Sequence, residues 1–408
     1  MDKSEFYRSA RDDFSGPLHG IRVLEATTAW AGPMAGCLLA DMGAEVIKIE
    51  HPKGEITRVL GPWVPGESSL SLMNETVNRN KRNLSVDMRQ PEGRTLVLEL
   101  AKSCDVMLEN FKPGTLHDWQ LGYEHVKAVK DDIVYVSISG FGQFGPHHQR
   151  AGYDPLVQSQ SGWMSLNGEP DSGPMKAPTF LGDDLGGIHG ALATLAALRH
   201  RDVSGEGQHV DVCLMDAILG ASNMYPSMAR LGIPMKRMGN QFAVTAPFNT
   251  YECRGGYVFL GMSLDSHWRT LTELMGQPEL GDDPRFATPQ ARVTHRDEAD
   301  ALVADWCLQQ EQTDVVERLG TAGLPVAPVN DYVDCANDPH MDERGMLQDV
   351  ELCDGSRVPL LGPVAKFSRT PTSIRSPAPT VGQDNEALLD ELGVEGARQR
   401  DLKNRGVI

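Results

Sequence analysis

Short apolar runs alternate with helical patterns over the first 140 residues. Residues 20–27 (GIRVLEAT) and 44–50 are apolar enough for buried strands, and residues 33–42 between them have helical spacing. Pro33 lies in the first turn of this helix and Gly43 lies beyond its end. The same alternation continues with a helix over 91–103, a strand over 106–109, a helix after Gly114 and a strand over 133–137. Repeated βα units of this kind predict a parallel, doubly wound sheet.

The pattern changes in the second half of the chain. An Ala-rich helix over 185–201, a strand over 209–212 and a helix over 214–231 are expected first. Residues 248–262 (FNTYECRGGYVFLGM) then alternate as a hairpin that turns at Gly255-Gly256. Helical patterns follow over 267–275, 298–309 and 313–321. These elements predict a smaller, inserted α+β domain.

The last 80 residues return to strands and end in helices. We expect a strand over 325–329, a hairpin that turns at Asp354-Gly355, an extended Pro-rich segment over 363–379 and two terminal helices. The predicted fold is therefore α/β, with a doubly wound, Rossmann-like large domain and a smaller inserted domain. Its expected segments are 1–205 (first part of the large domain), 206–247 (linker helix and connection), 248–324 (small domain) and 325–408 (return connection and rest of the large domain).

Composition and charge limit the function. Of 408 residues, 40% are apolar, which is typical of a globular chain, and the 56 acidic side chains exceed the 38 basic ones to give a net charge of −18. A field of that sign opposes binding to nucleic acid or to an anionic membrane, so an anionic ligand needs a local basic site. The seven cysteines are scattered without a CxxC pair, and residues 1–16 contain no apolar signal segment. We expect a cytoplasmic protein.

Several common cofactor motifs are missing. The first strand-to-helix turn is TTAWAGPMAG, in which Trp30 replaces a glycine that the dinucleotide motif GxGxxG needs. The chain has no GxxxxGK[ST] motif and no HExxH or paired-cysteine spacing. These observations argue against an NAD or FAD enzyme, a P-loop enzyme and a dedicated metal site.

The remaining motifs follow predicted strands: AGPMAG at 31–36, NRNKRNLSVD at 78–87, ENFKPG at 109–114, SGFGQFGP at 139–146, GYDPLVQSQSG at 152–162 and LGDDLGG at 181–187. In this order they resemble the family III CoA-transferases of the CaiB/BaiF type, and the resemblance runs from about Gly20 to the terminal VGQDNEALLDELG. It implies transfer of CoA from an acyl-CoA, such as succinyl-CoA, to a free carboxylic acid. It also implies a covalent aspartyl anhydride and aspartyl-CoA pathway, no prosthetic group and an interlocked homodimer.

The resemblance implies that Asp183, directly after Gly182, is the catalytic nucleophile. A carboxylate before Gly186-Gly187 at the start of a helix lies near backbone N–H groups and the positive end of the helix dipole, which stabilise an anion. An isolated aspartate at this place is more often a helix cap. We assign that capping role to the adjacent Asp184.

Motif alignment also implies a CoA site. Its expected residues are Trp30 and Ala31 at the pantetheine end, His51 near the phosphates, Asn78, Arg79, Asn80 and Lys81 at the nucleotide, and Asn110, Phe111 and Lys112 at the pantetheine or diphosphate. Asp118 occupies the position where formyl-CoA transferases have a CoA-binding arginine. Trp30 and Trp119 favour an acid larger than oxalate.

Two alternatives remain at this point. The related 2-methylacyl-CoA racemases have a histidine in a GHD motif, where this chain has Tyr153 in GYD. Because an unperturbed tyrosine is a poor base at neutral pH, this substitution favours transfer over racemisation, and we expect Tyr153 to be a packed aromatic. The other alternative is a CoA-binding subunit that acts with a paralogous chain.

Overall fold

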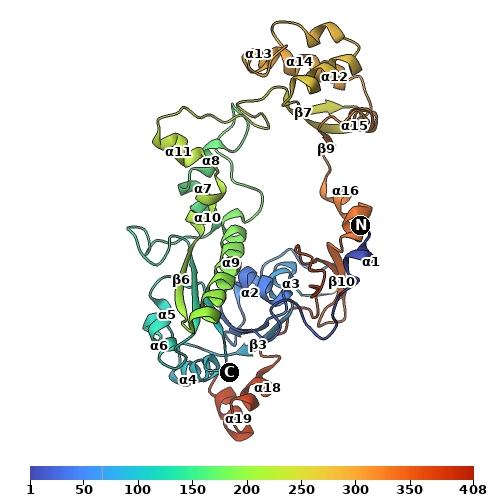
Figure 1. The fold of residues 1–408 in the computed structure, drawn as a ribbon. Helices are drawn as coiled ribbons and strands as arrows, with labels where there is room; N and C mark the ends of the chain where they lie inside the picture. Colours follow the sequence, from blue (N-terminus) through green and yellow to red (C-terminus); the bar gives the residue numbers. More distant parts are fainter. Residues whose placement is uncertain (67) are drawn as a thin grey trace. The chain divides into compact units, whose positions relative to one another are not determined.

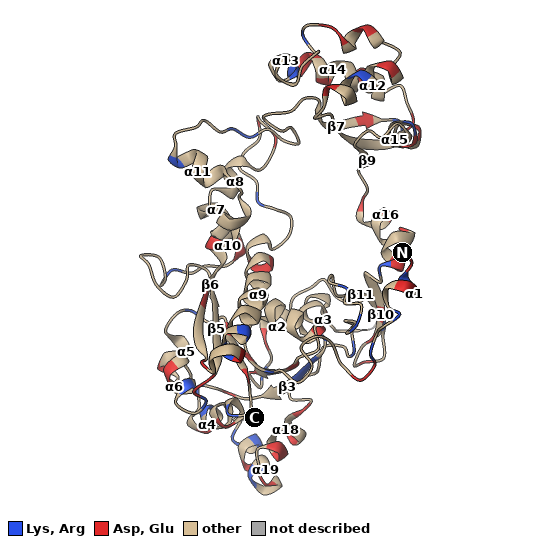
Figure 2. Cartoon of the chain, viewed as in Figure 1, with Lys and Arg blue, Asp and Glu red and all other residues tan. Residues whose placement is uncertain are grey.

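The computed structural model describes residues 1–66 and 68–408, which form two compact units. The larger unit comprises Met1–Trp163, Lys176–Arg230 and Pro339–Ile408, and the smaller comprises Met164–Met175 and Leu231–Asp338. Residues 248–324, expected as the small domain, all lie in the smaller unit. Acidic and basic residues are distributed over the elements of both units (Figure 2).

The larger unit is built on a six-stranded parallel sheet in the order β3-β2-β1-β4-β5-β6 (Figure 1). This arrangement confirms the predicted doubly wound α/β fold. The strands are β1 (Arg22–Ala26), β2 (Glu45–Glu50), β3 (Lys81–Ser85), β4 (Val106–Glu109), β5 (Val134–Ser139) and β6 (Gln208–Cys213). The chain order reverses between β1 and β4, so the carboxyl ends of these strands form the crevice where open α/β sheets bind ligands.

Helices cover both faces of this sheet. Those before residue 164 are α1 (Lys3–Phe6), α2 (Ala31–Asp41), the 3₁₀ turn η1 (Ile56–Arg58), α3 (Leu72–Asn78), α4 (Pro91–Ala101), α5 (Thr115–Asp118), α6 (Tyr123–Lys127) and α7 (Asp154–Gln160), with α8 (Trp163–Leu166) next. The others are α9 (Leu181–Ser204), α10 (Leu214–Ala221), α11 (Tyr225–Arg230), α17 (Pro339–Glu343), α18 (Asn385–Glu391) and α19 (Gly396–Asn404). A separate antiparallel hairpin consists of β10 (Leu347–Glu351) and β11 (Arg357–Leu361).

Alternate side chains of the strands enter two cores. On β1, Val23 packs in the core formed with α2 and α9, whereas Leu24 packs in the core formed with α4, α18 and α19 (Figure 1). Since successive side chains of a strand point to opposite faces, the C-terminal helices cover the face of the sheet opposite to α9. The N-terminal strands and the C-terminal helices therefore share one core.

The smaller unit has a three-stranded antiparallel sheet. It contains β7 (Phe248–Cys253), β8 (Gly256–Gly261) and β9 (Val326–Pro328) in that order. Its helices are α12 (Asp265–Leu274), η2 (Pro278–Gly281), α13 (Pro289–Thr294), α14 (Arg296–Cys307), α15 (Gln312–Thr321) and α16 (Tyr332–Ala336). The predicted hairpin and the three predicted helices are present.

One local expectation was wrong. The helix expected over 214–231 is divided into α10 and α11, because Asn223 has a φ of 52°, which a helix does not allow. One strand was not expected: β3 begins at Lys81 and lies at the edge of the sheet. Among the described residues, no helix combines the length and apolar character needed to span a membrane.

Candidate active site

Small residues bring the beginnings of α2 and α9 together. A Cβ at Gly187 would lie 2.8 Å from Met34 Cβ, and a Cβ at Gly190 would lie 3.2 Å from Ala35 Cβ. The glycines of α9 thus allow its backbone to approach α2 closely. Trp30, directly before α2, donates from Nε1 to Oδ1 of Asp184 at 2.7 Å. Ala31 is buried at the first position of α2 and packs in the core.

The first turn of α9 is capped from another helix. Asp154, the first residue of α7, is buried, and its Oδ1 accepts from the backbone N–H of Gly182 at 2.7 Å. Its Oδ2 accepts from Gln158 at 2.8 Å. The assignment of the cap to Asp184 was therefore wrong: Asp184 is inside the helix, where its N–H donates to the Phe180 carbonyl, and its carboxylate binds Trp30.

Asp183 is half-buried in the first turn of this 24-residue helix. Within the described part of the chain, no side chain or backbone N–H donates a hydrogen bond to its carboxylate. Burial, followed by the negative charges of Asp154 and Asp184, raises the pKa of Asp183 to about 7. Part of this carboxyl group is therefore ionised at neutral pH and part is protonated, whereas its two acidic neighbours have hydrogen-bond donors.

The turn before α2 is fixed by two side chains from elsewhere. Asn110, after β4, accepts from the N–H of Thr28 at 2.9 Å and donates to the Thr28 carbonyl at 2.8 Å. Glu55 accepts from the N–H of Ala29 at 2.8 Å and from the hydroxyl of Thr28 at 3.0 Å. Ala29 has a φ of 64°, a conformation that costs energy for a residue with a Cβ. These bonds hold the turn that positions Trp30.

Below this turn, Lys81 is buried among protein acceptors. Its Nζ lies 2.7 Å from Oε2 of Glu25 and donates to the Pro33 carbonyl at 2.9 Å and to Oδ1 of Asn78 at 3.0 Å. Three acceptors use the three protons of the ammonium group. Lys48 is also fully buried, and its Nζ lies 3.3 Å from Oε1 of Glu25 and 3.4 Å from Oε1 of Glu55. Lys81 and Asn78 were expected to contact a nucleotide, but in this structure their side chains contact protein groups instead.

Arg79 and Asn80 also have internal partners. Arg79 pairs with Asp41 at 2.6 Å, and Asn80 donates to the same carboxylate at 2.7 Å. Asn80 accepts from the N–H groups of Arg375 and Ser376, so it connects the C-terminal extended segment to the sheet. Residues 78–81 thus form one buried structural group in this chain.

A pocket of about 350 Å³ opens at the carboxyl ends of β1 to β4. It brings together His51 after β2, Arg89 after β3, and Phe111 with Trp119 after β4. Phe111 and Trp119 pack edge to face with ring centres 5.4 Å apart. The exposed guanidinium of Arg89 lies 2.6 Å from Nε2 of His51 and 2.8 Å from Asp87. A cation and an aromatic wall in the sheet crevice suit an anionic nucleotide.

Two expected residues lie outside this pocket. Lys112 is exposed and lines a neighbouring pocket of about 210 Å³, together with Glu109, Ser137 and His209. Tyr153 is 61% exposed, so the expectation of a packed aromatic was wrong. The cause is the position of Tyr153 directly before α7, where Asp154 rather than the tyrosine points into the structure.

The sequence analysis missed Asp154 and Arg89. Asp154 is part of the GYDP motif, but it caps α9 and not its own helix, so no local pattern indicates its role. Arg89 follows β3, and the strand itself was not predicted because its buried residues include Lys81 and Asn83.

Comparison with known proteins agrees with this fold. Residues 18–385 match the family model described as CoA-transferase family III. A succinate–glutarate CoA-transferase of Agrobacterium fabrum is 38% identical over 92% of this chain and 96% of its own length. A succinyl-CoA–D-citramalate CoA-transferase of Chloroflexus aurantiacus is 36% identical over 92% and 94%, respectively. The crystal structure of a CaiB/BaiF family protein from Brucella suis has a TM-score of 0.84 at 37% identity, covering 93% of this chain and all of that one.

The chain belongs to CoA-transferase family III. It is therefore an enzyme of CoA transfer between an acyl-CoA and a carboxylic acid, and the resemblance inferred from the motifs is confirmed. The interlocked dimer and the partner subunit stay predictions.

Proposed function

We propose that this enzyme transfers CoA from succinyl-CoA to a second dicarboxylic acid of the glutarate type, with Asp183 as the covalent nucleophile. The observation that supports this proposal most directly is the carboxylate of Asp183, half-buried at the N-terminal end of α9 and without a hydrogen-bond donor among residues 1–66 and 68–408. The two relatives described above are named for succinate or succinyl-CoA and a second acid.

The proposed reaction has four balanced steps. The Asp183 carboxylate attacks the thioester carbonyl of succinyl-CoA, forms a mixed anhydride and expels CoA thiolate. The thiolate attacks the aspartyl carbonyl, which releases succinate and leaves an aspartyl-CoA thioester. The acceptor carboxylate attacks this thioester, so that a new anhydride forms and CoA leaves again. Attack of CoA on the acceptor carbonyl releases the new acyl-CoA and restores Asp183.

The surroundings of Asp183 suit this cycle. The first-turn N–H groups of α9 and its dipole favour negative charge beside the nucleophile. A pKa of about 7 keeps part of the group ionised at neutral pH and makes it more nucleophilic than an exposed aspartate. Asp184 cannot approach a thioester as freely, because its carboxylate is bound to Trp30.

For CoA itself, we propose the crevice at the carboxyl ends of β1 to β4. Arg89 and His51 would contact phosphate, and Phe111 with Trp119 would pack against the nucleotide. Thr28 lines this pocket and Trp30 binds Asp184, so the turn that contains both leads from the nucleotide toward the helix of Asp183. In this proposal Asn78 and Lys81 support the turn, Asn110 fixes it, and Arg79 and Asn80 hold Asp41 at the other end of α2.

A trapping experiment tests the nucleophile. The purified enzyme is incubated with succinyl-CoA and glutarate, quenched with hydroxylamine, and digested for peptide mass spectrometry. We expect glutaryl-CoA in solution and a hydroxamate on Asp183. Asp183→Asn should lower the rate by at least ~10³-fold, because an amide cannot form the anhydride.

Asp184→Asn is the matched control, since it removes the same charge from the neighbouring residue and keeps an oxygen that can accept from Trp30. This variant should still give the hydroxamate on Asp183. A hydroxamate on residue 184 in the wild-type enzyme, or full activity of Asp183→Asn, would contradict the proposal.

A further inference from the structure

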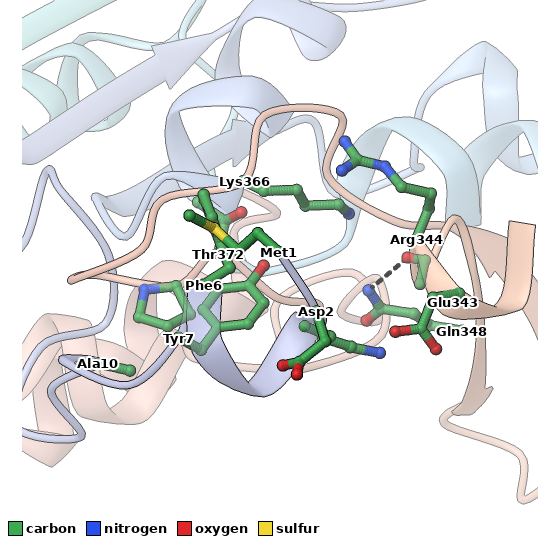
Figure 3. Close-up of a pocket in the computed structure, with 13 residues that line it drawn as sticks. Met1, Asp2, Phe6, Tyr7, Ala10, Glu343, Arg344, Gln348, Lys366 and Thr372 are labelled. Atoms are coloured by element: carbon green, nitrogen blue, oxygen red, sulfur yellow. Dashed lines mark hydrogen bonds between the residues drawn. The ribbon is translucent and has the colours of Figure 1, made fainter. Parts of the chain in front are cut away.

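A second pocket lies between the N-terminal segment and residues 343–372, away from the carboxyl edge of the sheet. It has a volume of about 690 Å³ and is formed by α1, the end of α17, β10 and the segment that follows β11. Figure 3 shows Lys366 and Arg344 on one side of this pocket and Phe6 and Tyr7 on the other. None of its residues belongs to the site proposed for CoA transfer.

Three basic side chains of this pocket have no acidic partner among the described residues. Lys3, Arg344 and Lys366 all line it, and no carboxylate of residues 1–66 and 68–408 lies within ion-pair distance of their nitrogens. Burial, followed by the positive charges of Arg344 and Lys3, lowers the pKa of Lys366. The Lys366 ammonium donates only to the Pro363 carbonyl, at 2.6 Å. The three cations therefore repel one another across a shared cavity.

Acidic residues nearby do not neutralise this cluster. Asp2 and Glu343 line the pocket, but neither forms an ion pair with the three cations, and the Asp2 carboxylate accepts from the N–H of Glu5 and the hydroxyl of Ser4, both at 2.7 Å. Basic positions stand beside acidic ones around α1 and β10 in Figure 2. By contrast, Arg11, just beyond the pocket, forms an ion pair with Asp13 at 2.5 Å. An unpaired group of three cations is unusual in a chain whose net charge is −18.

The opposite wall is apolar and aromatic. The rings of Phe6 and Tyr7 lie edge to face with centres 4.9 Å apart, and Ala10 and Pro371 extend this wall. A ligand that fills the pocket would consequently have an anionic group at one end and a ring or other apolar part at the other.

We propose that this pocket binds a small organic phosphate monoester. Its phosphate would contact Lys366, Arg344 and Lys3, and its organic part would pack along Phe6 and Tyr7. A phosphate monoester has about two negative charges at neutral pH and three acceptor oxygens, which suits one guanidinium and two ammonium groups better than a single carboxylate does. This site is independent of the transfer reaction, and its test needs no activity measurement.

Isothermal titration calorimetry of the full-length protein with adenosine 5′-monophosphate tests this proposal. Adenosine is the uncharged control, and glucose 6-phosphate separates sugar phosphates from nucleotides. We expect adenosine 5′-monophosphate to bind at least tenfold more tightly than adenosine, with the affinity falling as salt is raised. Tighter binding of glucose 6-phosphate would support the same site with a sugar phosphate as its ligand.

Variants locate the binding. Lys366→Met and Arg344→Met should each weaken the binding of adenosine 5′-monophosphate at least tenfold, and Lys3→Met provides an exposed third variant that leaves the fold intact. Arg11→Met, just beyond the pocket and paired with Asp13, should leave this binding unchanged. Loss of binding in Arg89→Met but not in the Lys366 and Arg344 variants would place the nucleotide in the crevice of the sheet and overturn the proposal, as would equal binding of adenosine and its monophosphate.

Discussion

The charge of Asp154 should control the pH at which Asp183 becomes reactive. Burial, then Asp154, then Asp184 raise the pKa of Asp183 from 3.8 to about 7. Since Asp154 is the second of three causes, its share is less than half of this rise of about three pH units, and we expect that removing its charge lowers the pKa by about one pH unit. Asp154→Asn removes the charge and keeps an oxygen to accept from the Gly182 N–H.

The assay is kcat/KM for CoA transfer between pH 5 and 9, because its pH dependence reports groups of the free enzyme. The wild-type value should fall about tenfold per pH unit below pH 7, since only the ionised Asp183 attacks. Asp154→Asn should have its midpoint near pH 6. At pH 6, Asp183 would be ionised in about half of the variant molecules and in about a tenth of the wild-type molecules. Relative to its own plateau at high pH, kcat/KM of the variant should therefore be about fivefold higher than that of the wild type.

Asp202→Asn is the matched control, because it removes the same charge from the other end of α9, about 28 Å away along the helix. Its midpoint should stay near pH 7. An unchanged midpoint in Asp154→Asn, or an equal shift in both variants, would refute the assignment of the pKa to this pair of carboxylates.

Two other predictions concern the supports of the site. Trp30→Phe removes the donor to Asp184, a bond to a charged group worth ~1.5–3 kcal/mol, so the free energy of urea unfolding should fall by up to this amount and kcat/KM should fall with it, because the turn beside Asp183 loses its link to α9. Lys81→Met leaves Glu25 short of one buried partner and should cost ~3–5 kcal/mol in urea unfolding, whereas Lys102→Met, in an exposed pair with Glu99, should cost less than ~1 kcal/mol. Similar losses in the two lysine variants would contradict the second prediction.

The sheet could be predicted because apolar side chains predominate inside most of its strands, although β1 contains the buried Glu25 and β2 the buried Lys48. Strands that are buried on both faces of a parallel sheet favour such apolar side chains. Strand β3 could not be found in this way. Its buried side chains Lys81 and Asn83 are polar, and they are stabilised by Glu25 and Glu50, residues far away in the sequence.

The site was predictable only in part, for the same physical reason. The position of Asp183 at a helix start follows from the local sequence LGDDLGG. The capping of that helix does not, because Asp154 reaches Gly182 from a different helix 28 residues earlier. The basic motif at 78–81 suggests phosphate contacts, but whether a lysine faces a ligand or a buried glutamate depends on packing that no local pattern records.

The buried ion pairs explain why motifs far apart in the chain act on one site. Lys81 holds Glu25, Glu25 holds Lys48, and Lys48 holds Glu55, so two positive and two negative groups balance in the interior. A Cβ at Gly36 would lie 1.8 Å from Oε2 of Glu25, which is why AGPMAG needs a glycine there. Such pairs give little net stability over apolar packing, so we infer that their role here is to position other groups. Glu55, the last residue of these ion pairs, fixes the strained turn before α2. From this turn Trp30 reaches Asp184, next to the proposed nucleophile.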